Sequence, residues 1–169
     1  MSKLSADTIA SSLLDAYGTL DVEELKRLVA ALAEQDQLQF LVAKALLQRA
    51  ESASLPVRCR AITLIMILGL WKIQSVLDGL FDVFENEFPE SELRRLAAAD
   101  RAGAIWHGRY SGKESVLRTL LYALMSTKAD RALLIASKVH SAFADLPFGE
   151  KIRKWMARFY PERAERFEL

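Results

Sequence analysis

Three basic residues near the C-terminus have a spacing that could bind a negatively charged partner. Lys151, Lys154 and Arg158 recur at i, i+3 and i+7, which places their side chains on one face of a helix. Arg153 lies nearby in the sequence. Such a row attracts acidic protein surfaces, phosphate backbones or anionic membranes. We predict a docking face for an acidic protein, and the alternative is a terminal helix whose charges are only solvated.

A second candidate is the run Trp106, His107, Gly108, Arg109 and Tyr110. Tryptophan, tyrosine and arginine are the residue types enriched in the hot spots of protein interfaces. This run therefore predicts a second contact with a partner. The alternative is a loop in which Trp106 anchors the chain to its own core.

The sequence does not match the motifs of enzymes that use a nucleophilic serine or that hydrolyse nucleotides. The string Gly108 to Gly112 contains Ser111, but its spacing differs from the nucleophile elbow of hydrolases and from the phosphate-binding loop of nucleotide hydrolases. The two histidines, His107 and His140, are far apart in sequence and lack the i, i+3 or i, i+4 pairing of metal ligands. We predict no catalytic, cofactor or metal site and therefore no cofactor.

An enzyme remains one alternative if its site is assembled from residues that are scattered in the sequence. The candidates for such a site are His107, Arg109, Glu92 and Asp130.

Charge is unevenly distributed along the chain. Residues 1–90 carry 8 Lys and Arg against 13 Asp and Glu, whereas residues 91–169 carry 15 against 9. A basic C-terminal half makes a nucleic-acid-binding regulator the second functional hypothesis. A pI of about 7.8 for the whole chain lies below the strongly basic range typical of such proteins, so protein is favoured over nucleic acid.

The elements that must carry these residues are predicted to be helices. The chain is 51% hydrophobic with only 7 Gly and 4 Pro, and apolar residues recur at helical spacing with no sustained strand alternation. Ser5 is the predicted cap of a first helix, Gly18 its left-handed C-terminal residue, and Asp21 with Glu24 a capping box. The helices expected are 6–17, one after Asp21, 37–51, 57–71, 72–86, 92–106, one after Ser111, one capped by Thr127, and one between Pro147 and Pro161.

Several apolar residues are expected to face the core. They are Val22, Leu25, Leu28, Val29 and Leu32 in the second helix, Leu38, Leu41, Val42, Ala45 and Leu46 in the third, and Leu133, Leu134, Ala136, Val139 and Phe143 in the eighth. The segment at about residues 57–71 is apolar nearly all round, so it should lie at the centre.

We therefore predict a compact all-α bundle of eight or nine antiparallel helices around the central helix at 57–71, forming a single domain over residues 1–169. The residues Leu55, Pro56, Val57 and Arg58, followed by Ala61 and Leu64, resemble the second helix of a HEAT-type repeat. This resemblance covers about ten residues and implies the alternative fold, a short HEAT-like array of helical hairpins.

The same features predict a cytoplasmic protein. A single cysteine excludes an intrachain disulfide. The N-terminus has no secretory pattern, and the apolar stretch from Ala61 to Trp71 is too short for a membrane span, which needs about 20 residues.

Together these observations predict a non-enzymatic protein-binding module that uses its helix faces, such as an adaptor, chaperone, immunity-type inhibitor or regulatory subunit. Its partner is expected to be another protein, with acidic character. A second copy of this chain is an alternative partner, because nearly every helix is strongly apolar.

Overall fold

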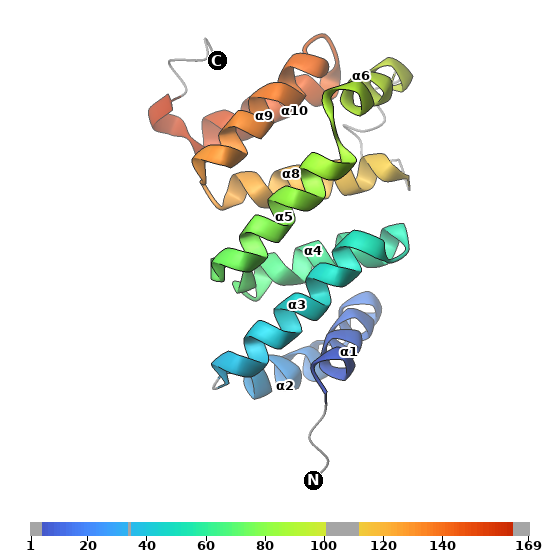
Figure 1. Cartoon of the computed structure of the whole chain (residues 1–169), viewed down its shortest axis with the longest axis vertical. Helices are drawn as coiled ribbons and strands as arrows, with labels where there is room; N and C mark the ends of the chain where they lie inside the picture. The colour runs from blue at the N-terminus through green and yellow to red at the C-terminus, as the bar shows by residue number, and fades with distance from the viewer. Residues whose placement is uncertain (1–4, 34, 101–111, 164–169) are drawn as a thin grey trace. The chain divides into compact units, whose positions relative to one another are not determined.

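The computed structural model of the chain describes residues 5–33, 35–100 and 112–163. Every regular element in these ranges is helical: nine α-helices (Figure 1), the 3-10 turn η1 and a second 3-10 turn at 161–163. The all-α prediction and the expected number of helices are therefore confirmed for this part of the chain. The helices are α1 Ala6–Thr19, α2 Val22–Ala33, α3 Asp36–Ser52, α4 Leu55–Ile67, η1 Leu70–Lys72, α5 Gln74–Glu87, α6 Glu90–Ala99, α8 Lys113–Ser126, α9 Asp130–Ala142 and α10 Pro147–Phe159.

The chain divides into two compact units, Met1–Leu80 and Phe81–Leu169, and the boundary falls within α5. The expectation of one domain over 1–169 stays a prediction. The division changes the charge balance, because the acidic residues between positions 81 and 90 belong to the C-terminal unit. The N-terminal unit carries 8 basic and 9 acidic residues, and the C-terminal unit carries 15 and 13. Neither unit is strongly charged.

Helix α4, the segment that was expected at the centre of the fold, belongs to the N-terminal unit. It packs against α3 and α1, and its residues Ala61, Ile62, Leu64 and Ile65 are buried. The helix ends earlier than expected, at Ile67, which is 66% exposed.

The residues that resemble a HEAT helix form the start of α4. Pro56 lies in its first turn, where a missing N–H costs nothing. Arg58 is buried, and its Nε donates a 2.6 Å hydrogen bond to the backbone oxygen of Ala50. This bond satisfies one of the carbonyls that the end of α3 leaves without a partner inside the helix. The arginine therefore stabilises the α3–α4 hairpin.

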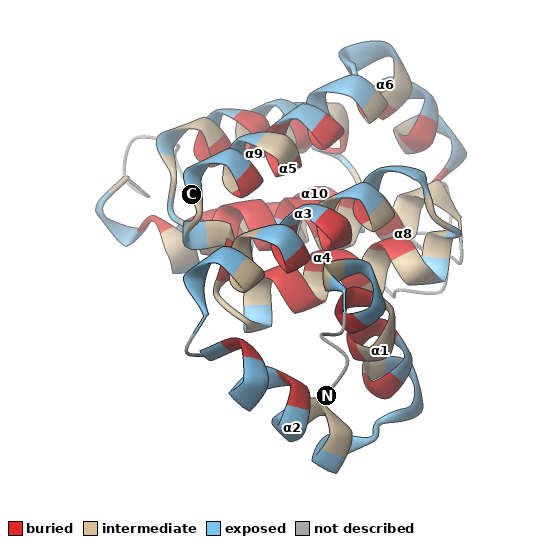
Figure 2. Ribbon diagram, turned by 60° about the horizontal axis from the view of Figure 1, so that its bottom comes forward, coloured by how far each residue is buried: buried red, intermediate tan, exposed pale blue. Residues whose placement is uncertain are grey.

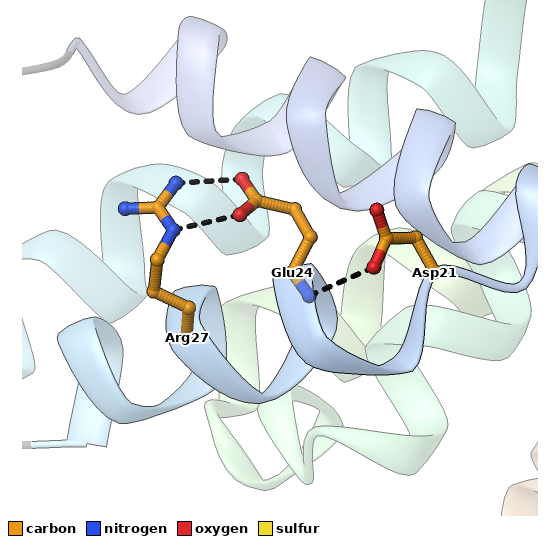
Figure 3. A network of polar contacts seen from close by, with 3 residues as sticks. All are labelled: Asp21, Glu24 and Arg27. Carbon is orange, nitrogen blue, oxygen red and sulfur yellow. Dashed lines mark hydrogen bonds and ion pairs between the residues drawn. The ribbon is translucent and has the colours of Figure 1, made fainter.

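The predicted caps of α1 and α2 are partly confirmed. The Ser5 hydroxyl accepts from the Thr8 amide at 3.2 Å, and Asp21 Oδ1 accepts from the Glu24 amide at 3.0 Å. The Glu24 carboxylate does not return the bond as a full capping box requires. It binds Arg27 instead, at 2.6 and 2.7 Å (Figure 3).

Gly18 does not end α1 in the left-handed conformation, so this expectation was wrong. Leu20 occupies that position, with φ 58°. Gly18 lies within α1, where the Arg60 guanidinium crosses the helix backbone. A Cβ at residue 18 would lie 2.3 Å from one guanidinium nitrogen, so this glycine permits a close approach and not a turn.

Some apolar residues that the helical spacing assigned to the core are exposed. In α2 only Leu28 and Leu32 are buried, and Val22 and Val29 face solvent. Figure 2 shows α2 largely in the colour of exposed residues. Leu41 of α3 is exposed as well. In α2 and α3 the apolar stripe is therefore wider than the part of the helix that the neighbouring helices cover.

Helix α9 is central to the C-terminal unit, where it packs against α6, α8 and α10. Leu133, Ala136, Val139 and Phe143 are buried as predicted, but Leu134 is 66% exposed.

Thr127 does not cap α9. It is the C-cap of α8, and its hydroxyl donates to the Leu124 oxygen at 2.6 Å. Ala129 is the N-cap of α9.

Glu92 connects α6 to α8. Its carboxylate accepts from Arg95 at 2.7 and 2.8 Å and lies 3.2 Å from the Lys113 ammonium. The Arg95 hydrogen bonds, together with Lys113, lower the pKa of Glu92 to about 2. The ionised carboxylate therefore joins α6 to the first residue of α8.

This low pKa predicts a pH-dependent contribution to stability. A carboxyl whose pKa falls on folding stabilises the fold above its unfolded pKa, near 4.5 for glutamate, and loses this effect as the pH falls toward 2. We expect Glu92→Gln to lower the free energy of unfolding at neutral pH by less than about 1 kcal/mol. The difference from wild type should shrink between pH 5 and pH 2, as measured by urea unfolding at several pH values. Arg95→Gln should show the same pH dependence, and a constant difference for either variant would contradict this role.

Candidate binding surface on α8 and α10

Helix α10 presents the predicted basic row beside the side that is fixed to the core. Pro147 lies in its first turn, and Phe148, Ile152, Trp155 and Met156 are buried. Since about 3.6 residues complete a turn, the side chains at 151, 154 and 158 fall on a flank of the helix, about 110° around from the centre of the buried side.

The structure brings Lys151, Lys154 and Arg158 to one face of α10, as their spacing predicts. Lys154 and Arg158 are exposed, and Lys151 is half-buried. Arg153 lies apart from this row, about 160° around the helix from Lys151. Its guanidinium binds Glu150 through two hydrogen bonds of 2.8 and 2.9 Å.

Two cations of the row lie over aromatic rings at the edge of the buried side. The Lys151 ammonium is 5.8 Å from the ring centre of Trp155, and the Arg158 guanidinium is 5.4 Å from that of Phe159. Contacts of this kind contribute about 0.5–1 kcal/mol each at exposed sites. They hold these two cations at the aromatic edge of α10.

Tyr122 of α8 completes the aromatic part of this surface. Its ring packs edge-on against Trp155 and Phe159, with ring centres 5.0 and 5.4 Å apart. Trp155 in turn contacts Phe148, which packs edge-on against Phe143 at 5.1 Å. The surface aromatics therefore rest on the fully buried phenylalanines of the unit. We call Tyr122, Lys151, Lys154, Trp155, Arg158 and Phe159 together the α10 surface.

The C-terminal end of α10 is attached to the start of α9. The Tyr160 hydroxyl donates to the Ala129 oxygen at 2.9 Å, and Arg163 lies 2.9 Å from the Asp130 carboxylate. Burial, with a smaller contribution from Asp130, raises the pKa of Tyr160 to about 12. Tyr160 is therefore a neutral hydrogen-bond donor at physiological pH and fixes this end of the surface.

Glu150 carries negative charge beside the row. The hydrogen bonds from Arg153 lower the pKa of Glu150, and Lys154, at 3.7 Å, adds a smaller effect in the same direction. Arg158 makes no ion pair with any residue in the described ranges. The negative charge of Glu150 therefore partly offsets the positive charge of Lys154, whereas Arg158 has no such carboxylate beside it in the described ranges.

The second predicted contact, at Trp106, His107, Arg109 and Tyr110, lies outside the residues that the structure describes. The other two residues of the scattered enzyme hypothesis are described. Glu92 is held by Arg95 and Lys113, and Asp130 by Arg163. In the described ranges both carboxylates serve as contacts between structural elements.

Sequence reasoning did not find Tyr122. It lies just after the core residues Leu120 and Leu121 of α8 but is itself exposed. In the sequence, Tyr122 stands out only as an aromatic residue outside the apolar stripe of its helix. That position does not indicate that Trp155 and Phe159 are its neighbours.

Within residues 5–33, 35–100 and 112–163, no group of three or more His, Cys, Asp or Glu side chains could hold a metal ion. No helix in the same ranges has the length and apolar character needed to cross a bilayer.

The α10 surface can therefore offer cations, aromatic faces and hydrogen-bond donors on a rigid helix. These groups suit the recognition of carboxylates and apolar side chains.

No family model matches the chain, and no curated protein or solved structure shows significant similarity to it.

Proposed function

We propose that this chain is a non-enzymatic protein-binding module whose C-terminal unit binds an acidic segment of another protein through the α10 surface. The observation that carries the proposal is a row of three cations, two of which lie over aromatic rings that pack against the rest of the unit. Adaptors, chaperones, inhibitors and regulatory subunits all use helix faces in this way, and the proposal covers that class.

The composition of the surface supports a protein partner. Tyr122 and Arg158 are exposed and are of residue types enriched among interface hot spots, and the buried Trp155 supports Tyr122 from beneath. Aromatic groups that are already ordered before binding lose little side-chain entropy on association. Carboxylates of an acidic segment would meet Lys151, Lys154 and Arg158, and its apolar atoms would cover Tyr122 and Phe159.

Nucleic acid is the weaker candidate. Basic and aromatic side chains together also suit single-stranded nucleic acid. However, the C-terminal unit carries 15 basic and 13 acidic residues, and the row includes only three cations. A surface with few cations gains little from the release of counterions, which supplies most non-specific nucleic-acid affinity.

Charge reversal on α10 tests this proposal. We expect the combined change Lys151→Glu, Lys154→Glu and Arg158→Glu to weaken binding of the captured acidic partner by at least about 10-fold, or about 1.4 kcal/mol. Partners are captured from native lysate, identified by mass spectrometry and then titrated as purified proteins at two salt concentrations. Binding to wild type should weaken with salt, because exposed charges are screened.

The matched control is Lys26→Glu, Lys44→Glu and Lys72→Glu, which makes the same change in net charge on exposed residues of the N-terminal unit. It should retain the partner. Tyr122→Ala should weaken binding without changing the charge. If the folded α10 variant keeps every partner at wild-type affinity, the α10 surface is not the docking site. If wild type binds a single-stranded oligonucleotide and no acidic protein, the nucleic-acid alternative replaces the proposal.

A further inference from the structure

Helix α2 carries an exposed apolar strip on a flank beside its buried side. Val22 is 55% exposed and Val29 is 39% exposed. The two valines are seven residues apart, which places them within about 20° of each other around the helix. Ala33 lies about 20° on the other side of Val22 and is exposed as well. These three residues, which we call the α2 strip, run along the whole length of α2.

The turn that leads into α2 holds a further exposed leucine in an unfavourable backbone conformation. Leu20 has φ 58° and is 77% exposed. The amides of Leu20 and Asp21 donate back to the oxygens of Tyr17 and Ala16. Glycine is preferred at the left-handed position of this helix-ending motif. A leucine there costs backbone free energy, and little of that cost is recovered by burial. It adds a large apolar group to the surface just before the α2 strip.

The charges of α2 are complementary to those of an antiparallel copy of the same helix. Its acidic residues, Glu23 and Glu24, lie in the first turn, and its basic residues, Lys26 and Arg27, follow them. The Lys26 ammonium is 2.9 Å from the Glu23 carboxylate. Lys26 is only about 40° around the helix from Val22, whereas Arg27 is about 140° away. With equal numbers of each sign, α2 favours neither an acidic nor a basic partner, but two copies in opposite directions match.

We propose that α2 packs antiparallel against α2 of a second copy, about a two-fold axis that places Val22 of each copy opposite Val29 of the other. This register brings Lys26 of one copy within reach of Glu23 of the other, because the two residues then differ in height along the helix axis by only about 3 Å. Leu20, which precedes α2, falls toward the alanine-rich end of the other helix.

Each of these contacts occurs twice, because the pairing is two-fold. The alanines at positions 30, 31 and 33 are exposed and small, so they allow the helix axes to approach to the distance of about 8–10 Å that is typical of packed helices. The valines and the leucine supply affinity in proportion to the apolar area that they bury, and the charged pairs fix the register. The α2 strip shares no residue with the α10 surface, so this self-association is additional to the proposed function.

Sedimentation equilibrium of the full chain, from micromolar to millimolar concentration, measures this association. We expect a monomer–dimer equilibrium without larger species, because a two-fold contact closes on itself. Val29→Glu changes a partly exposed residue, so the variant should fold, and it should weaken the dimer at least about 10-fold. A wild-type chain that is monomeric at every concentration, or a Val29→Glu variant that dimerises as wild type does, would overturn the proposal.

Leu20→Gly gives two readouts of opposite sign. Glycine adopts the left-handed conformation without strain, so the variant should unfold at a higher urea concentration than wild type when both are monomeric. Loss of the leucine side chain should at the same time weaken the dimer several-fold. If the more stable variant dimerises as wild type does, Leu20 has no part in the contact and the proposed register is wrong.

The charged pairs test the register directly. Lys26→Glu and Glu23→Lys should each weaken the dimer about 10-fold, and an equimolar mixture of the two variants should restore it as a heterodimer. Arg27→Glu is the matched control. It makes the same change in charge as Lys26→Glu and breaks the same kind of ion pair, here with Glu24 (Figure 3), but farther from the α2 strip. It should dimerise as wild type does. If it weakens the dimer as much as Lys26→Glu, or if the mixture stays monomeric, α2 does not pair in this way.

Discussion

Replacing Leu133 with alanine is expected to lower the free energy of unfolding by about 3 kcal/mol, whereas the same change at Leu134 should alter it by less than about 0.5 kcal/mol. The two leucines are neighbours on α9. Leu133 is 3% exposed in the core of the C-terminal unit, and Leu134 is 66% exposed. Truncating the first leaves a cavity and removes buried apolar area, while truncating the second removes atoms that already face water.

Urea unfolding followed by far-ultraviolet circular dichroism measures both values. The pair controls for residue type and for helix propensity, since each variant exchanges leucine for alanine in the same helix. Similar losses at both positions would mean that Leu134 is also covered, and the placement of α9 would be wrong.

Gly149→Ala is the second change with a large expected effect. Gly149 lies in the first turn of α10, where that helix approaches the end of α9. A Cβ there would lie 2.1 Å from the backbone oxygen of Phe143 and 2.7 Å from its carbonyl carbon. Backbone atoms cannot turn aside as a side chain does, so α10 would have to shift from its packing. We expect a loss of about 3 kcal/mol in the free energy of unfolding.

Gly18→Ala is the matched control for this clash. Its Cβ would come equally close to another group, but that group is the flexible end of the Arg60 side chain. Alanine is also favoured over glycine within a helix by about 1 kcal/mol, which offsets the displacement of the guanidinium. The expected net change is near zero in thermal or urea unfolding. A larger loss for Gly18→Ala than for Gly149→Ala would contradict this account of both glycines.

The sequence was sufficient to predict helices because apolar spacing and caps are local signals. The Ser5 cap and the first-turn position of Pro56 depend only on neighbouring residues, and both are present. The end of α1 was predicted incorrectly, because Gly18 lies within the helix under the guanidinium of Arg60, a contact between residues 42 positions apart. From the sequence alone, a glycine near a helix end can be there for a left-handed turn or for the close approach of another side chain, and the two cases look the same.

The degree of burial of each apolar residue was less predictable. Helical spacing indicates which side of a helix is apolar, but it does not show how much of that side another helix covers. Val29 and Leu134 belong to the same apolar stripes as their buried neighbours Leu28 and Leu133. Both are nevertheless exposed, because they lie beyond the surface that another helix covers. Whether such a residue is buried or exposed depends on how the other helices pack against it.

The same distinction applies to the candidate sites. The row Lys151, Lys154 and Arg158 lies on one helix, so its spacing was enough to predict a common face. Tyr122 joins that row from α8. Sites that are assembled from separate helices require tertiary contacts, which no local pattern in a single sequence specifies.

The chain of rings from Phe143 through Phe148 and Trp155 to Tyr122 has a consequence for the thermodynamics of recognition. Because the outer rings are immobilised by inner ones, the receptor side needs no disorder-to-order transition when a ligand arrives. Calorimetric titration should then show a heat capacity change that matches rigid-body association, without the much larger change that accompanies coupled folding. Any ordering that does accompany complex formation would come from the acidic segment.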